Sequence, residues 1–563
     1  MALLNFVLPT SNASLNHPSI THLSSLDKQH RIFKRNVEVS TRRAVPRTNP
    51  ASQPVVRCLK GVAFPETSII NQLLKVDSVL PFPLVPVTEE LSRKDFPTDF
   101  MFGCSTSALQ TEGSGTEGGR GPSTWDSFIG TNEKAVDSYN RYKEDVQALK
   151  SMGANCYRFS ISWSRLLPKG TISGGINQEG ITFYNNFINE LIKNGITPVV
   201  TLFHFDLPTA LQNKYNGFLD SQIVDDFKAY ADLCFKTYGD RVKYWITINE
   251  PQVFGQYGYK MGLSSSYKDI ASTPFIAIHN IILSHATAAK HYQETYKPTQ
   301  KGEIGISLVV EWFEPESSDK PDKDAAERAF DFLTGWMLEP LVFGDYPFIM
   351  KAVVGKDLPT FTTAQKTLIK GSYDYIGVNY YTSRYATAVA YTYGETYSSF
   401  SDYQHVTLSV YKDGKLLGEK APGSSEIYVY PPGLGKALVY IHTYYKQPKI
   451  YVTENGYPEK RDDSIPEKTA LQDDARIEHM IAHMTEIAKA IKEGANVKSY
   501  CMWSLMDCLE MGSSYNVRYG LYYTDYSTLN RIAKKSSSWL KNFNTTTSTA
   551  TVTATATATA TAT

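Results

Sequence analysis

The chain has 563 residues, and its 57 basic and 57 acidic side chains give a formal net charge of zero at pH 7. This balance gives no reason to expect nucleic acid or an acidic surface as a partner. No apolar run is long enough to span a bilayer, and the six cysteines include no CxxC pair, so neither a membrane span nor a zinc site is expected.

The first 58 residues differ in composition from the rest of the chain. They are rich in Ser, Thr, Asn and Arg, and their only acidic residues are Asp27 and Glu38. The opening stretch MALLNFVLPT is too short and broken for a secretory signal, whereas this composition is typical of an organelle transit peptide. With Ala2 and the VVRC that ends at Cys58, it resembles plastid transit peptides. We therefore predict plastid (chloroplast) targeting for residues 1–58, with a merely disordered arm as the alternative.

Residues 59–94 are predicted to form an N-terminal extension, and residues 95–543 a single domain in which strand-like and helix-like runs alternate. Four helical runs carry apolar residues at i, i+3, i+4 spacing and end at glycine, a common C-terminal stop. They cover residues 137–153, 180–195, 221–239 and 473–494. The eight strand candidates cover residues 99–108, 155–163, 196–205, 242–251, 302–312, 373–382, 448–456 and 497–507.

The strand candidates are almost continuously apolar. This pattern indicates a sheet that is buried on both faces rather than one with a solvent face. Eight such strands separated by helices favour an α/β fold of the closed (β/α)₈ barrel type. A doubly wound open sheet is the alternative, although no G-x-G-x-x-G or G-x-x-x-x-G-K-[ST] motif opens any of the helices.

Most of the strand candidates finish in polar residues that can take part in chemistry. In a (β/α)₈ barrel the C-terminal ends of the strands meet on one face, where active sites lie. Several polar residues converging on that face would make a pocket. The residues concerned are Gln110, Arg158, Ser160, His204, Asn249, Glu250, Asn379, Tyr380, Tyr381, Glu454, Trp503 and Glu510.

Two of these strands end on a carboxylate. VKYWITINEP ends on Glu250 followed by proline, and PKIYVTENG ends on Glu454. Paired carboxylates across a cleft suit cleavage of a glycosidic bond, in which one donates a proton and the other stabilises or attacks the oxocarbenium-like centre. The acid then needs a raised pKa and the nucleophile has to stay ionised, which Arg158 and Tyr381 can support. A pair of surface glutamates at strand ends is the alternative.

Several blocks of the chain, in order, resemble the plant β-glucosidases of glycoside hydrolase family 1. TINEP is similar to the acid/base motif of that family, and YVTENG to its nucleophile motif. Further blocks are DFMFGCSTSALQTEG, YRFSISWSRLLP, VTLFHFDLP, IGVNYYTSR and WSLMD. The resemblance covers residues 95–543 and implies a (β/α)₈ barrel and a retaining β-glucosidase.

The resemblance also implies roles for the matching positions. Glu250 would be the general acid/base and Glu454 the nucleophile, with Arg158 and Tyr381 orienting the nucleophile. The sugar would be bound by Gln110, His204, Asn249, Asn379, Tyr381, Trp503 and Glu510. Taken singly, His204 and Trp503 would be interpreted as core residues with satisfied N–H groups, but their place in the family blocks favours the sugar site. Proton transfer and displacement need only the two carboxylates, so no cofactor and no metal are implied, and the expected partner is a small-molecule glycoside.

The chain departs from the family pattern at the sugar site and on the leaving-group side. WSLMDCLEM replaces the usual WSLLDNFEW, so Cys508, Leu509 and Met511 stand for Asn, Phe and Trp, and Met511 has no donor for the sugar. Glu426 stands where a Trp commonly precedes IYVYP, and we place Glu426 and Met511 on the leaving-group side. Shortened segments after Phe128 and after Gly262 suggest an open mouth for a bulky aglycone, such as a steroid, terpenoid or alkaloid.

These departures leave an alternative function open. A catalytically silent or altered relative could bind glycosides, transfer glycosyl groups or perform other chemistry on the same barrel. The last twenty residues, 544–563, are dominated by alternating Ala and Thr, and we predict a disordered tail. A homo-oligomer is compatible with the sequence.

Overall fold

The computed structural model describes residues 91–113, 115–130, 134–263, 271–392 and 394–545. The predicted transit peptide, nearly all of the N-terminal extension and almost all of the predicted tail lie outside the described residues. The shortened segments after Phe128 and Gly262 lie partly outside them.

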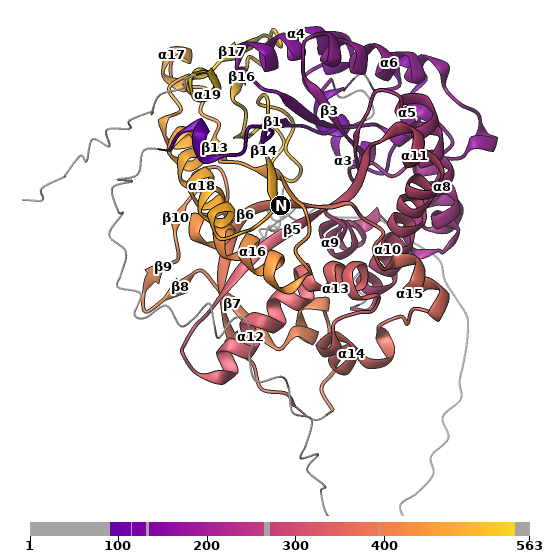
Figure 1. The fold of residues 1–563 in the computed structure, drawn as a ribbon, viewed down its shortest axis with the longest axis vertical. Helices are drawn as coiled ribbons and strands as arrows, with labels where there is room; N and C mark the ends of the chain where they lie inside the picture. The colour runs from indigo at the N-terminus through magenta and orange to yellow at the C-terminus, as the bar shows by residue number, and fades with distance from the viewer. Residues whose placement is uncertain (1–90, 114, 131–133, 264–270, 393, 546–563) are drawn as a thin grey trace, which may run out of the picture.

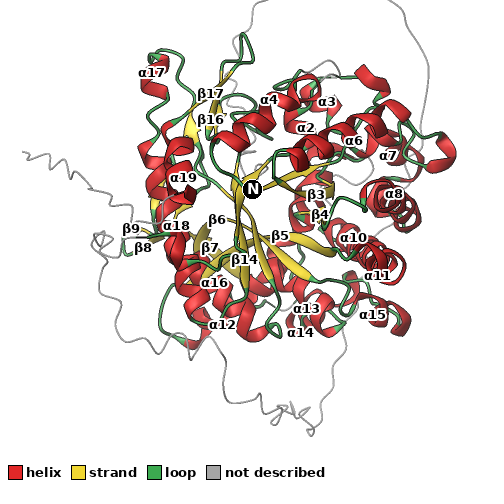
Figure 2. Ribbon diagram, turned by 45° about the horizontal axis from the view of Figure 1, so that its top comes forward, coloured by secondary structure: helices red, strands yellow, loops and turns green. Residues whose placement is uncertain are grey.

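Eight parallel strands form a closed barrel, which lies at the centre of the molecule (Figures 1 and 2). Each strand pairs with the next along the chain, and the last strand, β14, pairs with the first, β1, which closes the ring. The barrel predicted from the sequence is confirmed, and the open doubly wound sheet is wrong. The strands are β1 Met101–Ser105, β2 Cys156–Ser160, β3 Thr197–Phe203, β4 Tyr244–Asn249, β5 Glu303–Pro315, β6 Tyr375–Ala388, β12 Ile450–Asn455 and β14 Val497–Trp503.

Helices surround the barrel and cover the outer face of its sheet (Figure 1). The four predicted amphipathic runs form α4 Ser138–Ser151, α6 Gln178–Lys193, α8 Gln222–Tyr238 and α18 Asp474–Lys492. Three of these helices are followed by glycines with positive φ, Gly153, Gly195 and Gly494, a conformation that stops a helix and that glycine adopts without strain.

The remaining elements complete the outer layer and the loops at the barrel mouth. Other helices of seven or more residues are α7 Thr209–Tyr215, the π-helix η6 Phe254–Leu263, α10 Thr273–His291, α12 Lys320–Phe330, α13 Trp336–Phe343, α14 Phe348–Val354, α15 Thr363–Ile369, α16 Pro431–Tyr444 and α19 Lys535–Thr545. The longest of the other strands is β7 Val406–Ser409, which pairs antiparallel with the extended end of β6.

Side chains fill the inside of the barrel. A compact interior cluster contains Cys156, Val199, Ile246, Tyr375, Tyr451 and Cys501, while a much larger apolar cluster lies between the strands and the outer helices. All five cysteines of the described segments are free and buried. Among the described residues, no helix has the length and apolar character needed to cross a bilayer.

Candidate active site

Glu250 stands directly after β4 and is almost fully buried. Its backbone has φ 41° and ψ 60°, a left-handed conformation that is uncommon for a residue with a side chain. Its N–H donates to the carbonyl of Ser307 on the next strand (2.8 Å), and Pro251 begins α9 immediately afterwards. The chain therefore turns sharply at Glu250, where the strand ends and a helix starts.

Glu454 lies near the end of β12, which β5 and β6 separate from the β4 strand of Glu250, and is also buried. Its Oε1 forms an ion pair with the guanidinium of Arg158, which has no exposed surface, and its Oε2 accepts a hydrogen bond from the Tyr381 hydroxyl (2.9 Å). Both oxygens of the carboxylate are thus oriented by side chains from β2 and β6, as expected from the sequence.

A continuous hydrogen-bond network joins the two carboxylates. Asn379 donates through Nδ2 to Glu250 Oε1 and to Asn249 Oδ1, both at 3.0 Å. The same Asn249 oxygen accepts from Arg158 Nη2 (2.6 Å), and Arg158 also holds Glu454. Side chains from four strands therefore tie Glu250 and Glu454 into one polar cluster inside the mouth of the barrel.

The charges around Glu454 act in opposite directions. Burial raises the pKa of this carboxyl group above its ordinary value, and the nearby Glu250 raises it further, while the charge and hydrogen bond of Arg158 lower it. Arg158 therefore counteracts the desolvation of Glu454, which is the role that the sequence assigns to it.

A third buried carboxyl group, Glu510, lies in the loop after β14. Its Oε1 accepts from the indole N–H of Trp503 (3.0 Å), and its Oε2 accepts from Gln110 Nε2 (3.3 Å). Cys508 contacts the same carboxylate through its thiol at 3.8 Å. Burial raises the pKa of Glu510 to about 8, because these neutral donors only partly offset the loss of water.

His204, after β3, packs against Trp503 with ring centroids 5.8 Å apart and nearly parallel planes. Burial and the charge of Arg158 lower the pKa of His204 well below its ordinary value, so the ring is neutral. Its Nε2 faces Asn249 Nδ2 at 3.1 Å and has to accept there, so the proton lies on Nδ1. Nδ1 is buried with no partner among the described residues, and is a free donor for a hydroxyl group.

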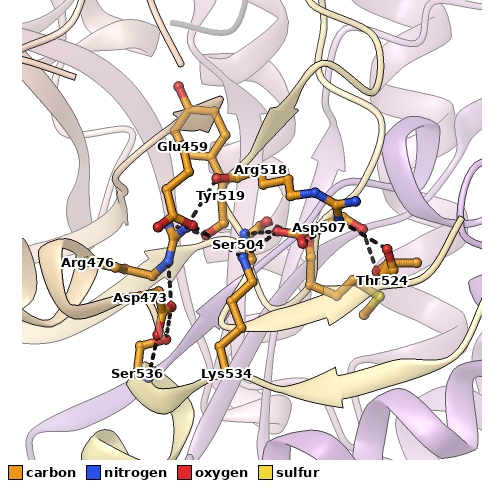
Figure 3. Close-up of polar contacts among 12 residues, drawn as sticks. Glu459, Asp473, Arg476, Ser504, Asp507, Arg518, Tyr519, Thr524, Lys534 and Ser536 are labelled. Atoms are coloured by element: carbon orange, nitrogen blue, oxygen red, sulfur yellow. Dashed lines mark hydrogen bonds and ion pairs between the residues drawn. The ribbon is translucent and has the colours of Figure 1, made fainter. Parts of the chain in front are cut away.

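A buried network of charged residues supports the loop that carries Glu510 (Figure 3). Asp507 has no exposed surface, and its carboxylate accepts from Lys534 Nζ (2.9 Å), Arg518 Nη1 (2.8 Å) and the Gly520 N–H (2.9 Å). Beside it, Arg476 pairs with Asp473 at 3.0 Å and with Glu459. The loop between β14 and α19 is therefore fixed by short ion pairs.

Comparison with known families decides the class of protein. The model of Glycosyl hydrolase family 1 matches residues 92–549. The chain belongs to glycosyl hydrolase family 1. The match spans the whole barrel and every residue of the site described above.

Plant members of this family are similar over most of the chain. A furostanol glycoside 26-O-β-glucosidase from Hellenia speciosa is 47% identical over 501 residues, which cover 85% of this chain and 88% of the relative. Raucaffricine-O-β-D-glucosidase from Rauvolfia serpentina is 43% identical over 494 residues, covering 80% and 91%. The crystal structure of a rice β-glucosidase aligns with a TM-score of 0.78 at 41% identity, over 80% of this chain and 99% of that one. The family 1 β-glucosidase predicted from the sequence is confirmed.

A cavity of about 750 Å³ opens along β5 of this family 1 barrel, and Val309 in its lining pairs with Asn379 of the polar cluster. We call it the mouth cavity. It is lined by the segment that follows Glu250, by the ends of β5 and β6, and by residues 398–410 and 425–428. Glu426 lines this cavity, whereas Met511 does not and is instead buried in the large apolar cluster.

Some polar residues at the strand ends serve the scaffold. Ser160 accepts a hydrogen bond from the N–H of Ala108 (2.7 Å), and the Tyr380 hydroxyl donates to the carbonyl of Tyr430 (2.6 Å). Neither contacts the two carboxylates in the described structure.

Other residues near the site carry no recognisable signal in the sequence. Thr201 accepts from Arg158 Nε (3.2 Å), the Tyr519 ring packs edge-on against Tyr381, and Glu311 and Arg384 line the mouth cavity. Arg384 stands in the quoted IGVNYYTSR block, but its place in a cavity has no signature in the sequence.

Proposed function

We propose that this chain is a retaining β-glucosidase that hydrolyses the β-glucoside of a plant specialised metabolite with a bulky aglycone. The observation that carries the proposal is the network in which Asn379, Asn249 and Arg158 hold Glu250 and Glu454 together. Membership of family 1 and the names of the two plant relatives support the same reaction and the same kind of substrate.

In the first step, Glu454 attacks the anomeric carbon while the bond to the glycosidic oxygen breaks. Glu250 transfers its proton to that oxygen, and the aglycone leaves as an alcohol. In the second step, Glu250 takes a proton from water, whose oxygen attacks the same carbon and displaces Glu454. Two inversions release glucose with its original configuration.

The surrounding side chains prepare both steps. Arg158 and Tyr381 orient Glu454 and favour its ionised form, so that it can act as the nucleophile. Asn249 is assigned to the 2-hydroxyl group, where a hydrogen bond strengthens in the transition state. Gln110, His204 and Glu510 are assigned to hydrogen bonds with the sugar hydroxyl groups, and Trp503 to stacking on the sugar ring. The free Nδ1–H of His204 supplies one of these hydrogen bonds.

The nucleophile can be identified by trapping. A 2-deoxy-2-fluoro-β-glucoside with an activated leaving group slows the second step, so a covalent glycosyl-enzyme should accumulate. Peptide mass spectrometry is expected to place the sugar on Glu454. Glu454→Gln should lower nitrophenol release from 4-nitrophenyl β-glucoside by orders of magnitude, while Glu467→Gln at an exposed position serves as the control.

The acid/base has a different signature. Glu250→Gln should slow glucosides with poor leaving groups much more than activated ones, because only the former need a proton on the departing oxygen. Added azide should restore turnover of the activated substrate, since this nucleophile needs no general base. A trapped fluorosugar on a residue other than Glu454 would refute the roles assigned to Glu250 and Glu454. If the protein releases the aglycone from no simple or plant glucoside, the catalytically silent or altered relative is favoured instead.

We further propose that the chain is imported into plastids. The acid-poor, Ser- and Arg-rich composition of residues 1–58 supports this location. A fluorescent protein fused after residue 58 should accumulate in plastids, and secretion of the fusion would refute the proposal.

A further inference from the structure

The mouth cavity has an unusual charge pattern. Among the described residues, the charged side chains that line it are two acidic ones, Glu311 near the end of β5 and Glu426 in the segment before α16, and one basic one, Arg384 from β6. With all three ionised, these described lining residues together carry one net negative charge. Val253 and Tyr257, which follow Glu250 in the chain, line the same cavity. The negative charge of the lining therefore lies on the side of the candidate proton donor.

Arg384 does not neutralise either carboxylate closely. Its Nε lies 3.8 Å from Glu311 Oε2, and its Nη2 lies 3.4 Å from Glu426 Oε2. The better contact of Arg384 is to the backbone carbonyl of Glu426, at 2.9 Å. Charge-assisted hydrogen bonds normally measure about 2.7–2.9 Å. If Arg384 served only to bridge two structural acids, short bonds to both would be expected.

Of the charged groups of Glu311, Glu426 and Arg384, that of Glu311 has the poorest hydrogen bonding. The residue is 6% exposed, and among the described residues no donor lies within hydrogen-bond distance of its carboxylate. Burial raises the pKa of Glu311, and the charge of Arg384 only partly opposes this effect. A buried carboxylate without a close partner loses its hydration and gains little in return. A ligand that supplies a positive charge would remove this penalty.

We propose that the mouth cavity receives an aglycone that carries a protonated amine, which binds between Glu311 and Glu426. A neutral apolar aglycone would cover Glu311 without pairing it, and an anionic aglycone would meet a net negative lining. The inference rests on the proposed β-glucosidase function and narrows its substrate class to cationic, alkaloid-type glucosides. Glu426 lies toward solvent with 31% of its side chain exposed, so it meets the amine first and Glu311 pairs with it inside.

Matched substrates can test the charge preference. The β-glucosides of 4-(2-aminoethyl)phenol, 4-(2-hydroxyethyl)phenol and 3-(4-hydroxyphenyl)propanoate have leaving groups of similar size and acidity, but carry a positive, no and a negative charge. The purified protein is expected to hydrolyse the amine with about tenfold higher kcat/KM than the alcohol, because only the amine can form a charge-assisted hydrogen bond with the carboxylates. The carboxylate should be the poorest of the three.

Variants assign the preference to the cavity. Glu311→Gln should reduce the amine-to-alcohol ratio to about one, and Glu426→Gln should reduce it partly. Glu314→Gln is the matched control, because Glu314 lies on the same strand but pairs with Lys436 (2.5 Å) and does not line the cavity. Glu314→Gln should keep the amine-to-alcohol ratio of kcat/KM of the unsubstituted protein.

The outcomes separate the two proposals. Equal rates for the amine and the alcohol, a preference for the alcohol, or a ratio that survives Glu311→Gln would overturn the cationic aglycone while leaving the β-glucosidase intact. Hydrolysis of 4-nitrophenyl β-glucoside without hydrolysis of any of the three would do the same. Failure with every glucoside, including 4-nitrophenyl β-glucoside, would instead overturn the proposed function itself.

Discussion

Two regions of this barrel bury similar groups in opposite ways. In the loop after β14, Asp507 accepts three bonds of 2.8–2.9 Å, from Lys534, Arg518 and a backbone N–H (Figure 3). In the mouth cavity, Glu311 and Glu426 face Arg384 at 3.8 and 3.4 Å. The charges around Asp507 are paired within the protein. The carboxylates of the mouth cavity, in contrast, can still accept hydrogen bonds from a ligand.

The difference separates a structural role from a binding role. A buried charge is tolerated when ion pairs and hydrogen bonds replace its hydration, and it is costly when they do not. The Asp507 network meets that condition without a ligand and holds the loop that carries Glu510. The mouth cavity meets it only if a ligand supplies the missing charge. Three substitutions test this distinction through stability alone.

The largest effect is expected where the network is complete. Asp507→Ala leaves Lys534 and Arg518 buried without their shared carboxylate, so the free energy of unfolding should fall by about 3–5 kcal/mol. Asp345→Ala is the control, since Asp345 also pairs with two cations, Lys351 and Lys366, but is partly exposed. The free energy of unfolding of Asp345→Ala should fall by at most about 1 kcal/mol. Urea unfolding followed by fluorescence measures both, and equal losses would contradict the distinction.

A smaller, pH-dependent effect is expected at Glu510, whose donors are all neutral. Its pKa is about 8 in the folded protein, above the ordinary value of 4.5. Below pH 4.5 both the folded and the unfolded chain hold this proton. As the pH rises toward 8, the unfolded chain loses the proton while the folded chain keeps it, so stability falls, and above 8 the loss is complete.

Glu510→Gln removes this penalty. The Tm of the variant relative to the unsubstituted protein should therefore increase between pH 5 and pH 8 and then level off. A pKa difference of one unit is worth about 1.4 kcal/mol, so the gain at pH 8 should exceed about 2 kcal/mol. Differential scanning calorimetry across this range provides the measurement. A Tm difference that does not change with pH would show that the folded protein does not hold the Glu510 proton.

The smallest effect is expected at Glu311, where a gain is predicted. Glu311→Gln removes a buried carboxylate without a close partner, so at pH 7 the free energy of unfolding should rise by about 1 kcal/mol. Glu314→Gln breaks a close pair on the same strand and should not stabilise. A clear loss of stability in Glu311→Gln would mean that the cavity charges are structural, like those around Asp507.

Much of the site could be predicted from the sequence. Glu250, Glu454, Arg158 and Tyr381 each stand in or just after a recognisable apolar strand, and the barrel brings such positions to one face. The structure places all four in one cluster, as predicted. Residues that act from outside these positions, such as Thr201 and Tyr519, carry no comparable signal, because their contacts depend on how neighbouring strands and loops pack.

By itself, the sequence determined the eight strands, the helices between them and the order of polar residues at the strand ends, because apolar runs and glycine stops are local properties of the chain. Only the tertiary structure decided that Glu311, Arg384 and Glu426 share one cavity. These three residues lie far apart in the chain, and whether a charge is paired depends on distances of a few tenths of an ångström. Such distances are set by the packing of the complete barrel and its loops.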